Sequence, residues 1–388
     1  MKASAFVYPW DVNGDPAAPG RIAALGVEQV TLAAAYHSTR ALTPRHPRHR
    51  IVTAEHAAVL YPAGDRWEGR ALRPYPAGDW APGDAFGEAA DALADAGLEV
   101  HTWVVLAHNS RLGAERPDTS VVNAYGDRYP WAPCIAQPAT RAYLVDLAAE
   151  AAVRPGARGT ELESLGWYGL QHLHAHDKTG GVGLGDAGQY LMALCFCPAC
   201  REGYGRQGGL DADALAAAVR AALTPVWQGV PSDGGWAGVE KLLGETIANA
   251  TRAWREETAR TLQETAVAAV RSAAAEGFQV LLHADPVSYH VGANPGVDPA
   301  HILSVADGVV VPCAGGPGPL TPFAERRAEG AVLAANFTVV SGMGGSPYTL
   351  AADAALARER GATELRLYHA GLASDGDLSV VREALAGR

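Results

Sequence analysis

A repeated alternation of short apolar runs with longer amphipathic segments constrains the fold of this chain most strongly. Eight such pairs follow one another along the sequence. Several of the apolar runs are almost continuously hydrophobic, which is typical of strands buried on both faces of a parallel sheet. The predicted strands cover 3–9, 28–36, 99–106, 160–167, 278–284, 307–312, 331–338 and 363–369.

The segments between these runs have the periodicity of helices. Pro138 suits the first turn of a helix, and Leu144 and Leu147 then lie on one face. A longer helical pattern covers 238–276 and stops at Gly277. Shorter helices are predicted at 16–25, 84–96, 298–306, 322–329, 349–360 and 375–386.

Eight strand-helix units that end in a helix favour a (β/α)8 barrel, with a doubly wound α/β sheet as the alternative. The connections after the second, third and fourth strands are long, at 37–83, 107–137 and 168–237, whereas the returns from the helices are short. Barrel enzymes build their sites on such loops. We therefore expect residues 1–388 to form a single barrel domain, with 171–237 as an insertion after the fourth strand.

Composition and charge narrow the classes of function. The chain is 48% apolar and 19% charged, as soluble globular proteins are. Its net charge of −11 disfavours nucleic-acid and membrane surfaces, and the short basic run at 45–50 is interpreted as a solvated loop. The first residues lack the apolar core of a signal peptide, and no transmembrane run is visible. We expect a cytoplasmic protein without nucleic-acid or membrane partners; a homo-oligomer is compatible with the sequence.

Three of the five cysteines lie in the segment CFCPAC at 195–200. The spacing C-x-C-x-x-C lets three thiolates converge on one tetrahedral ion. The best candidate for a fourth ligand is Cys134, in the loop after the third strand. Because a four-cysteine site is closed, we predict a structural zinc bound by Cys134, Cys195, Cys197 and Cys200. The alternatives are buried small hydrophobic residues and, less favoured, a redox centre.

This arrangement resembles the glycoside hydrolase family 42 β-galactosidases and related uncharacterised barrels of the glycosidase superfamily. In that family a cysteine after strand 3 and a C-x-C-x-x-C motif after strand 4 hold a zinc, and the same motif is present here at the four cysteines. The order of the eight predicted strands is compatible with the family over most of the chain. The resemblance implies a barrel that acts on a saccharide or glycoside.

The resemblance also implies a catalytic glutamate at the end of the fourth strand. Glu161 and Glu163 are two residues apart and point the same way, and Glu163 is nearer the mouth of the predicted barrel. By position Glu163 takes the role of the general acid, although Leu162 stands where the family has an asparagine. The alternative is a structural carboxylate that neighbouring groups hydrogen-bond.

The second carboxylate departs from the family pattern. Retaining barrel glycosidases place a nucleophilic glutamate at the end of strand 7, but the segment 331–345 contains no acid. Asp285 follows the fifth strand and shares a face with His283. Glycosidases need two carboxyl groups, about 5 Å apart for retention and about 6.5–9.5 Å apart for inversion. We predict Asp285 as base or nucleophile opposite Glu163, with an Asp-Pro turn as the alternative.

Other polar and aromatic side chains gather at the same predicted end of the barrel. Sugar rings stack on aromatic faces, although most aromatic residues and single histidines have structural roles. The predicted substrate-binding residues are His37, Trp103, His108, Asn109, Arg111, Trp167, His174, Asp177, His283, Tyr368 and His369.

Two other functions stay open beside a glycoside hydrolase. In a metal-dependent hydrolase or isomerase, Glu163, His283, Asp285 and a histidine from 172–176 or His369 would bind a catalytic divalent ion. The missing acid on the seventh strand instead motivates a sugar-binding barrel that has lost catalysis. We favour the glycoside hydrolase.

Overall fold

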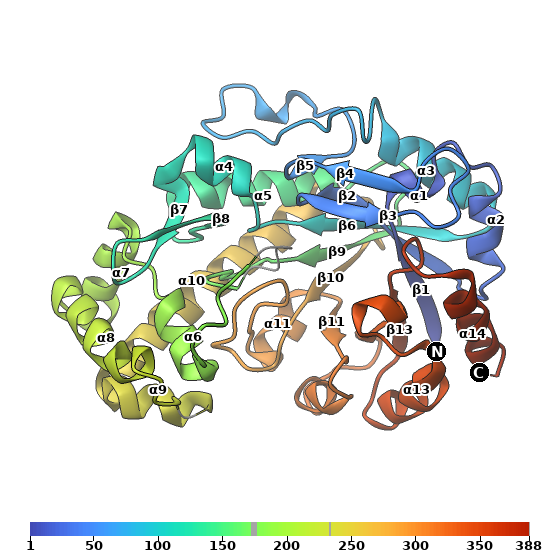
Figure 1. Cartoon of the computed structure of the whole chain (residues 1–388). Coiled ribbons are helices and arrows are strands. Elements are labelled where there is room, and N and C mark those ends of the chain that lie inside the picture. Colours follow the sequence, from blue (N-terminus) through green and yellow to red (C-terminus); the bar gives the residue numbers. More distant parts are fainter. Residues whose placement is uncertain (172–176, 233, 388) are drawn as a thin grey trace.

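A closed barrel of eight parallel strands forms the centre of the computed structural model, which describes residues 1–171, 177–232 and 234–387 (Figure 1). The first strand closes the barrel because it pairs with both the last and the second, with Lys2 opposite Glu364 and Ser4 opposite Gln29. The (β/α)8 prediction is therefore confirmed over the doubly wound alternative. The strands are β1 (Lys2–Val7), β2 (Gln29–Tyr36), β6 (Glu99–Val105), β9 (Gly159–Glu163), β10 (Gln279–His283), β11 (Gly308–Pro312), β12 (Val332–Thr338) and β13 (Glu364–Tyr368).

Helices cover the outside of the barrel and bury the apolar faces that the sequence pattern predicts. Leu144 and Leu147 of one helix and Leu262 and Val270 of another belong to the same hydrophobic core as the outward residues of the strands. The covering helices are α2 (Ala18–Ala23), α3 (Ala85–Asp95), α5 (Pro138–Ala152), α10 (Glu245–Ala273), α11 (Pro299–Val305), α12 (Thr321–Ala324), α13 (Leu350–Glu359) and α14 (Asp375–Ala386).

Two helix predictions were wrong in their extent. The pattern at 238–276 forms two helices, α9 (Gly235–Leu243) and α10, because Gly244 between them has a φ of +79° and turns the chain. Only glycine adopts this conformation without strain. The helix expected at 322–329 ends already at Ala324.

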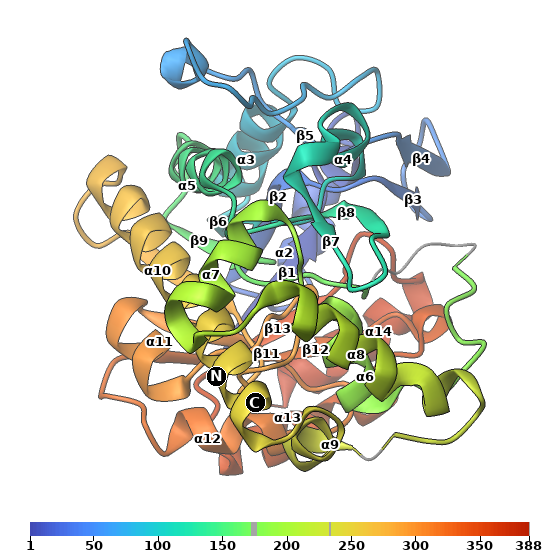
Figure 2. The same ribbon diagram turned by 90° about the vertical axis from the view of Figure 1, so that its left-hand side faces the viewer.

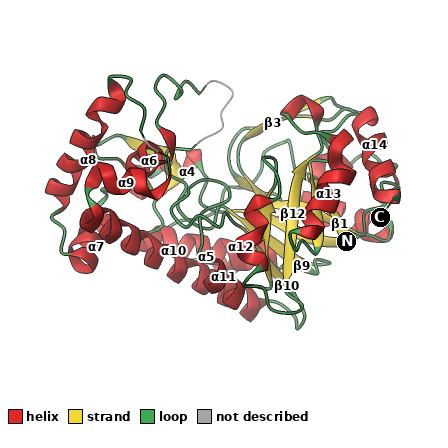
Figure 3. Cartoon of the chain, turned by 90° about the horizontal axis from the view of Figure 1, so that it is seen from below, coloured by secondary structure: helices red, strands yellow, loops and turns green. Residues whose placement is uncertain are grey.

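The long connections carry secondary structure of their own. After β2 the chain forms the hairpin β3 (Thr39–Leu42) and β4 (Ile51–Ala54), and β5 (Ala58–Val59) then pairs with β2. A helix and a second hairpin follow β6, and three helices follow β9 on one side of the barrel (Figures 2 and 3). These elements are α4 (Ser110–Glu115), β7 (Ser120–Val122), β8 (Arg128–Pro133), α6 (Gly185–Ala193), α7 (Pro198–Gly208) and α8 (Ala212–Trp227).

Side chains that point into the barrel form layers, because alternate residues of each strand face inward. An aliphatic layer contains Leu281, Val310, Val332 and Ala334. An aromatic layer lies toward the carboxyl ends of the strands and includes Phe6, Trp103 and Tyr368, among others. The aromatic layer therefore lies at the end of the barrel where the predicted site residues are expected. No helix in the described part of the chain is long and apolar enough to cross a membrane.

Candidate active site

The two glutamates of β9 have different surroundings. Glu161 is fully buried, and its Oε1 accepts hydrogen bonds from Arg366 Nε at 2.5 Å and Thr31 Oγ1 at 3.1 Å. Burial opposes its ionisation, but the charge of Arg366 and the neighbouring His283 lower the pKa of Glu161 to about 2. His283 Nε2 lies 3.5 Å from the second carboxylate oxygen of Glu161. Glu161 is thus a permanently ionised group inside the barrel.

Glu163 lies one layer closer to the mouth. Its Oε2 accepts a hydrogen bond of 2.7 Å from Trp103 Nε1, and the residue is 9% exposed. Tyr8, Tyr36 and Tyr368 come from the ends of β1, β2 and β13 and lie close enough for the charge of Glu163 to affect their phenols. Burial raises the pKa of all three, so they stay neutral hydroxyl groups.

A row of stacked rings extends from this aromatic layer. His37 stacks on Tyr36 with 4.2 Å between ring centroids, His108 lies 4.8 Å from His37, and Tyr168 stacks on His108 at 4.3 Å. Burial and then the charge of Glu163 raise the pKa of the Tyr168 phenol. The row starts at Tyr36, whose ring packs on Trp103 with 4.5 Å between centroids, and Trp103 in turn donates to Glu163. The structure therefore brings the predicted residues His37 and His108 into the neighbourhood of Glu163.

Asp285 lies in a cavity beside this row. Its Oδ1 accepts the Val287 N–H at 2.7 Å, and its Oδ2 lies 3.1 Å from His290 Nδ1. This hydrogen bond to Asp285 raises the pKa of His290. The cavity has a volume of about 560 Å³, and Tyr168 is also part of its wall. Its other polar and aromatic lining residues are Gln171, Thr179, Asp186, Gln189, Tyr190, Tyr289 and Asn294.

Glu163 itself does not line this cavity in the part of the chain that the structure describes. Strand β9, which ends at Glu163, and strand β10, which ends two residues before Asp285, are paired neighbours. The arrangement thus has two carboxyl groups at the ends of adjacent strands, and Asp285 lines a cavity with polar and aromatic walls.

Several predicted residues lie away from this cavity. Trp167 is buried and donates its indole N–H to the Arg255 carbonyl at 3.0 Å. Asn109 caps α4 by accepting the Leu112 N–H, and Arg111 pairs with the exposed Glu115 at 2.9 Å.

Asp177 lies near Tyr168, whose pKa its charge also raises. His174 falls in 172–176, outside the described residues, as do His172 and His176 of the metal-site alternative.

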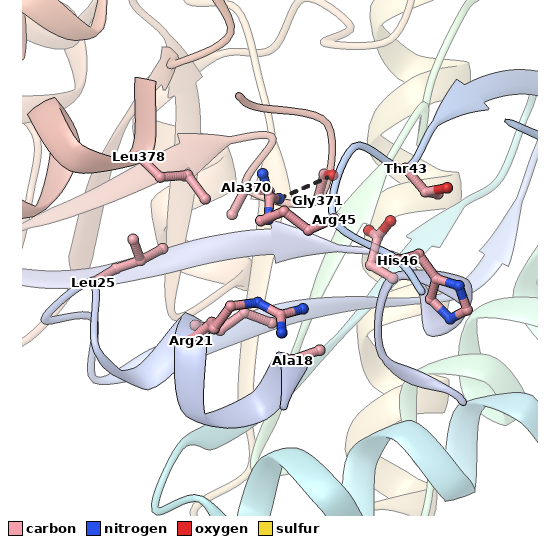
Figure 4. A pocket seen from close by; sticks show the side chains of 11 residues that line it. Ala18, Arg21, Leu25, Thr43, Arg45, His46, Ala370, Gly371 and Leu378 are labelled. Atoms are coloured by element: carbon pink, nitrogen blue, oxygen red, sulfur yellow. Dashed lines mark hydrogen bonds between the residues drawn. The ribbon is translucent and has the colours of Figure 1, made fainter. Parts of the chain in front are cut away.

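His369 is fully buried beneath the aromatic layer and stacks on Tyr8 at 4.2 Å. Burial lowers its pKa to about 3, so it is a neutral imidazole. Asp11, whose pKa burial raises to about 7, has a carboxylate oxygen 4.0 Å from His369 Nδ1. A pocket of about 30 Å³ lies beside them, where Arg45 donates to the carbonyl groups of Ala370 and Gly371 (Figure 4). It has room for only about one or two water molecules, which excludes a sugar ring.

Tyr8, Tyr36 and His290 are site neighbours that the sequence analysis missed. Tyr36 is the last residue of β2 and Tyr8 directly follows β1, so their positions at the strand ends were a usable signal. His290 lies seven residues after the end of β10, in a loop. The sequence of this loop has no periodic pattern, so the position of His290 could not be predicted from it.

The four predicted zinc ligands converge in a separate, buried cluster. Their sulfur atoms all lie within 4.8 Å of one another, and Cys134 Sγ is 3.6 Å from both Cys197 Sγ and Cys200 Sγ. A tetrahedral zinc with bonds of about 2.3 Å needs sulfur atoms about 3.8 Å apart, so the donor set fits this ion. Hydrogen bonds from Cys134 and its neighbours lower the pKa of the Cys197 thiol, whereas burial raises the pKa of the Cys134 and Cys200 thiols.

The cysteines come from two connections. Cys134 follows β8, whereas Cys195, Cys197 and Cys200 lie between α6 and the first turn of α7. The Cys195 sulfur also accepts the Val122 N–H of β7 at 3.4 Å. A metal here joins the hairpin after β6 to the insertion after β9 and has no position for a substrate.

Comparison with solved structures identifies the architecture. The chain superimposes over its full length on an α-L-fucosidase from Paenibacillus thiaminolyticus, with a TM-score of 0.59 and 11% identity, covering 49% of that enzyme. It also matches the PgaB (BpsB) glycoside hydrolase domain from Bordetella bronchiseptica, with a TM-score of 0.57, 15% identity and 99% of both chains covered. A GH42 β-galactosidase from G. stearothermophilus matches with a TM-score of 0.53 and 12% identity, over all of this chain and 56% of that one.

The chain has a TIM-barrel glycoside hydrolase-like fold. This glycosidase-like barrel spans about half the length of the fucosidase and of the β-galactosidase. No protein-family model and no curated protein matches its sequence. At these identities the likeness concerns the fold, so the function of the glycosidase-like barrel has to be argued from its own residues.

Proposed function

We propose that this chain is a glycoside hydrolase that binds its saccharide in the cavity at the carboxyl end of the barrel. Glu163 is the general acid that protonates the leaving oxygen, and Asp285 is the base or the nucleophile. The observation that carries the proposal is the placement of these two carboxyl groups at the ends of the paired strands β9 and β10, beside a cavity that Asp285 and Tyr168 line.

The surroundings of each group suit its role. A hydrogen bond from Trp103 holds the carboxyl group of Glu163 among buried rings, away from bulk water. The N–H of Val287 and the ring of His290 hold the two carboxylate oxygens of Asp285 in place. Two carboxyl groups in different surroundings are what glycoside hydrolysis needs. Among the predicted contacts, His37, His108 and Tyr368 surround the Glu163 side, and the cavity adds the amides of Gln189 and Asn294.

The metal-dependent alternative has less support. Among the described residues, the four cysteines form the one cluster of His, Cys, Asp and Glu side chains that could hold a metal. The inactive sugar-binding barrel is favoured by β12, whose residues Asn336 and Thr338 stand on the same face as Val332 and Ala334 where the family places an acid. Activity therefore has to be tested directly.

The experiment measures hydrolysis of a panel of 4-nitrophenyl glycosides by the wild type, Glu163→Gln and Asp285→Asn. We expect each variant to lower kcat by about 100- to 10,000-fold, because each removes a group that transfers a proton or attacks the anomeric carbon. Asp298→Asn is the matched control: this residue accepts the His301 N–H as the cap of α11, outside the site, and asparagine caps equally well.

Full activity in Glu163→Gln would contradict the proposal. Sugar binding by the wild type without any turnover would favour the inactive barrel instead. The anomeric configuration of the first product, followed by NMR, decides the role of Asp285: retention makes it the nucleophile and inversion makes it the base.

A further inference from the structure

Trp103 is held rigidly at the inner side of Glu163. It is 1% exposed, and its ring packs against Phe6 of β1 and Tyr36 of β2, with 4.7 and 4.5 Å between ring centroids. The ring of Tyr368 on β13 is nearly perpendicular to that of Trp103, with 5.9 Å between the ring centroids. These contacts come from three strands other than its own β6. The indole therefore has no room to rotate, and it cannot touch a substrate that stays in the cavity.

The hydrogen bond between Trp103 and Glu163 has a defined direction. An indole nitrogen donates a proton and cannot accept one. Glu163 Oε2, 2.7 Å from Trp103 Nε1, must therefore be the accepting, unprotonated oxygen. When Glu163 carries the proton that a general acid needs, that proton lies on Oε1.

Among the described residues, the indole of Trp103 is a side-chain donor to the Glu163 carboxyl group. The Leu106 N–H donates instead to the main-chain carbonyl of Glu163, at 3.0 Å. The phenols of Tyr8, Tyr36 and Tyr368 lie near Glu163 and stay protonated, because burial raises the pKa of each. Tyr8 donates its hydroxyl proton to Tyr36 at 3.1 Å.

We infer that Trp103 is a positioning residue that fixes the orientation of the Glu163 carboxyl group and assigns the transferable proton to Oε1. The inference rests on the proposed function, in which Glu163 is the general acid. From its sequence position, Trp103 was predicted to bind the substrate; it orients Glu163 instead. It acts on the reaction through Glu163 alone.

The test removes the indole N–H in two ways. Benzothienylalanine at position 103 keeps the fused ring and has a sulfur atom where the N–H was, whereas Trp103→Phe removes the donor together with part of the ring. We expect kcat to fall about ten- to a hundredfold with KM nearly unchanged, since a hydrogen bond to a charged group is lost. We also expect the alkaline limb of the pH–rate profile to move to higher pH, because the donor stabilises the carboxylate over the acid.

Trp67→Phe is the matched control. Trp67 is a second buried indole that donates to a buried glutamate, with 2.6 Å between its Nε1 and Glu150 Oε2, but the pair lies outside the barrel. This variant should lose stability and leave kcat and the pH profile unchanged. If Trp103→Phe and the benzothienylalanine protein behave as Trp67→Phe does, the inference is wrong.

A second measurement does not depend on turnover. In protein labelled with ¹⁵N-tryptophan, the indole N–H signal of Trp103 should shift with pH in the wild type and lose this shift in Glu163→Gln. If neither the pH nor the Glu163→Gln substitution moves the Trp103 signal, the inference is wrong. An inactive wild type with a responding Trp103 signal would contradict the proposed function and leave the hydrogen bond itself established.

Discussion

Glu161 and Glu163 are the same residue type on the same face of one strand, yet the barrel gives them opposite tasks. Arg366 and Thr31 donate to Oε1 of Glu161, and His283 lies 3.5 Å from its Oε2, whereas Glu163 accepts from Trp103 and lies near neutral phenols. Alternate residues of a strand point into the barrel, so both side chains face inward and differ only in depth. Glu163 lies at the mouth, whereas Glu161 lies one layer deeper and is enclosed by the strands. Position along the strand therefore decides which carboxyl group is free to react.

The Glu161–Arg366 pair predicts a large loss of stability when it is broken on one side. Arg366→Met leaves an uncompensated carboxylate in the barrel, and we expect the free energy of unfolding to fall by about 3–5 kcal/mol. The double variant Glu161→Gln, Arg366→Met should recover much of this loss. Urea unfolding measures both.

Arg116→Met serves as the comparison, because Arg116 forms an exposed pair with Asp118 at 3.1 Å. Its removal should lower the free energy of unfolding far less than the removal of Arg366, because water screens an exposed pair. Equal losses in Arg366→Met and Arg116→Met would contradict the importance of the buried pair.

At the scale of single residues, the sequence was informative where a residue sat at a strand end. Glu163 and the four cysteines were predicted from position and spacing, and the cysteines do converge. His290 was not predicted, because its contact with Asp285 depends on the path of a loop between β10 and α11. The buried contacts of Trp167 and the cap formed by Asn109 likewise depend on tertiary packing.

At the scale of elements, strands were easier to predict than helix ends. All eight predicted strands are present, and most are short apolar runs that are buried. The fourth was predicted at 160–167 but ends at Glu163, because its sequence GTELE is not a continuous apolar run. The break between α9 and α10 was missed because Val239, Leu243 and Ala248 continue the apolar periodicity across it. Only the backbone angle of Gly244 marks the turn, and a single glycine inside a helical pattern is a weak signal.

The cysteine cluster predicts that a metal joins two elements. We expect one zinc ion per chain by elemental analysis, and Cys197→Ser should lose it together with several kcal/mol of stability. Cys313→Ser is the control, because Cys313 is also buried but its sulfur donates to the Val311 carbonyl, outside the cluster. Full zinc content in Cys197→Ser would contradict a four-cysteine site.

At the scale of the whole molecule, we propose that the barrel and the insertion 171–237 form a single folding unit. Leu191 of α6 and Leu223 of α8 are fully buried in the same hydrophobic core as the strands. Native-state hydrogen exchange of the zinc-bound protein tests this: the amides of α6 and α8 should open only together with those of β10.

In Cys197→Ser we expect the same helices to open before the barrel does. Insertion amides that exchange early even with zinc bound would instead show a separate unit. Leu282 of β10, fully enclosed between β9 and β11, supplies the reference amide for the barrel.

The closure of the barrel has a consequence for how the protein is made. β1 pairs with β13, and Lys2 lies opposite Glu364. About 360 residues therefore have to be synthesised before the first strand meets this partner. At roughly 10 residues per second this takes on the order of half a minute. During that time the growing sheet has an open edge, so the barrel closes only after nearly the whole chain has been synthesised.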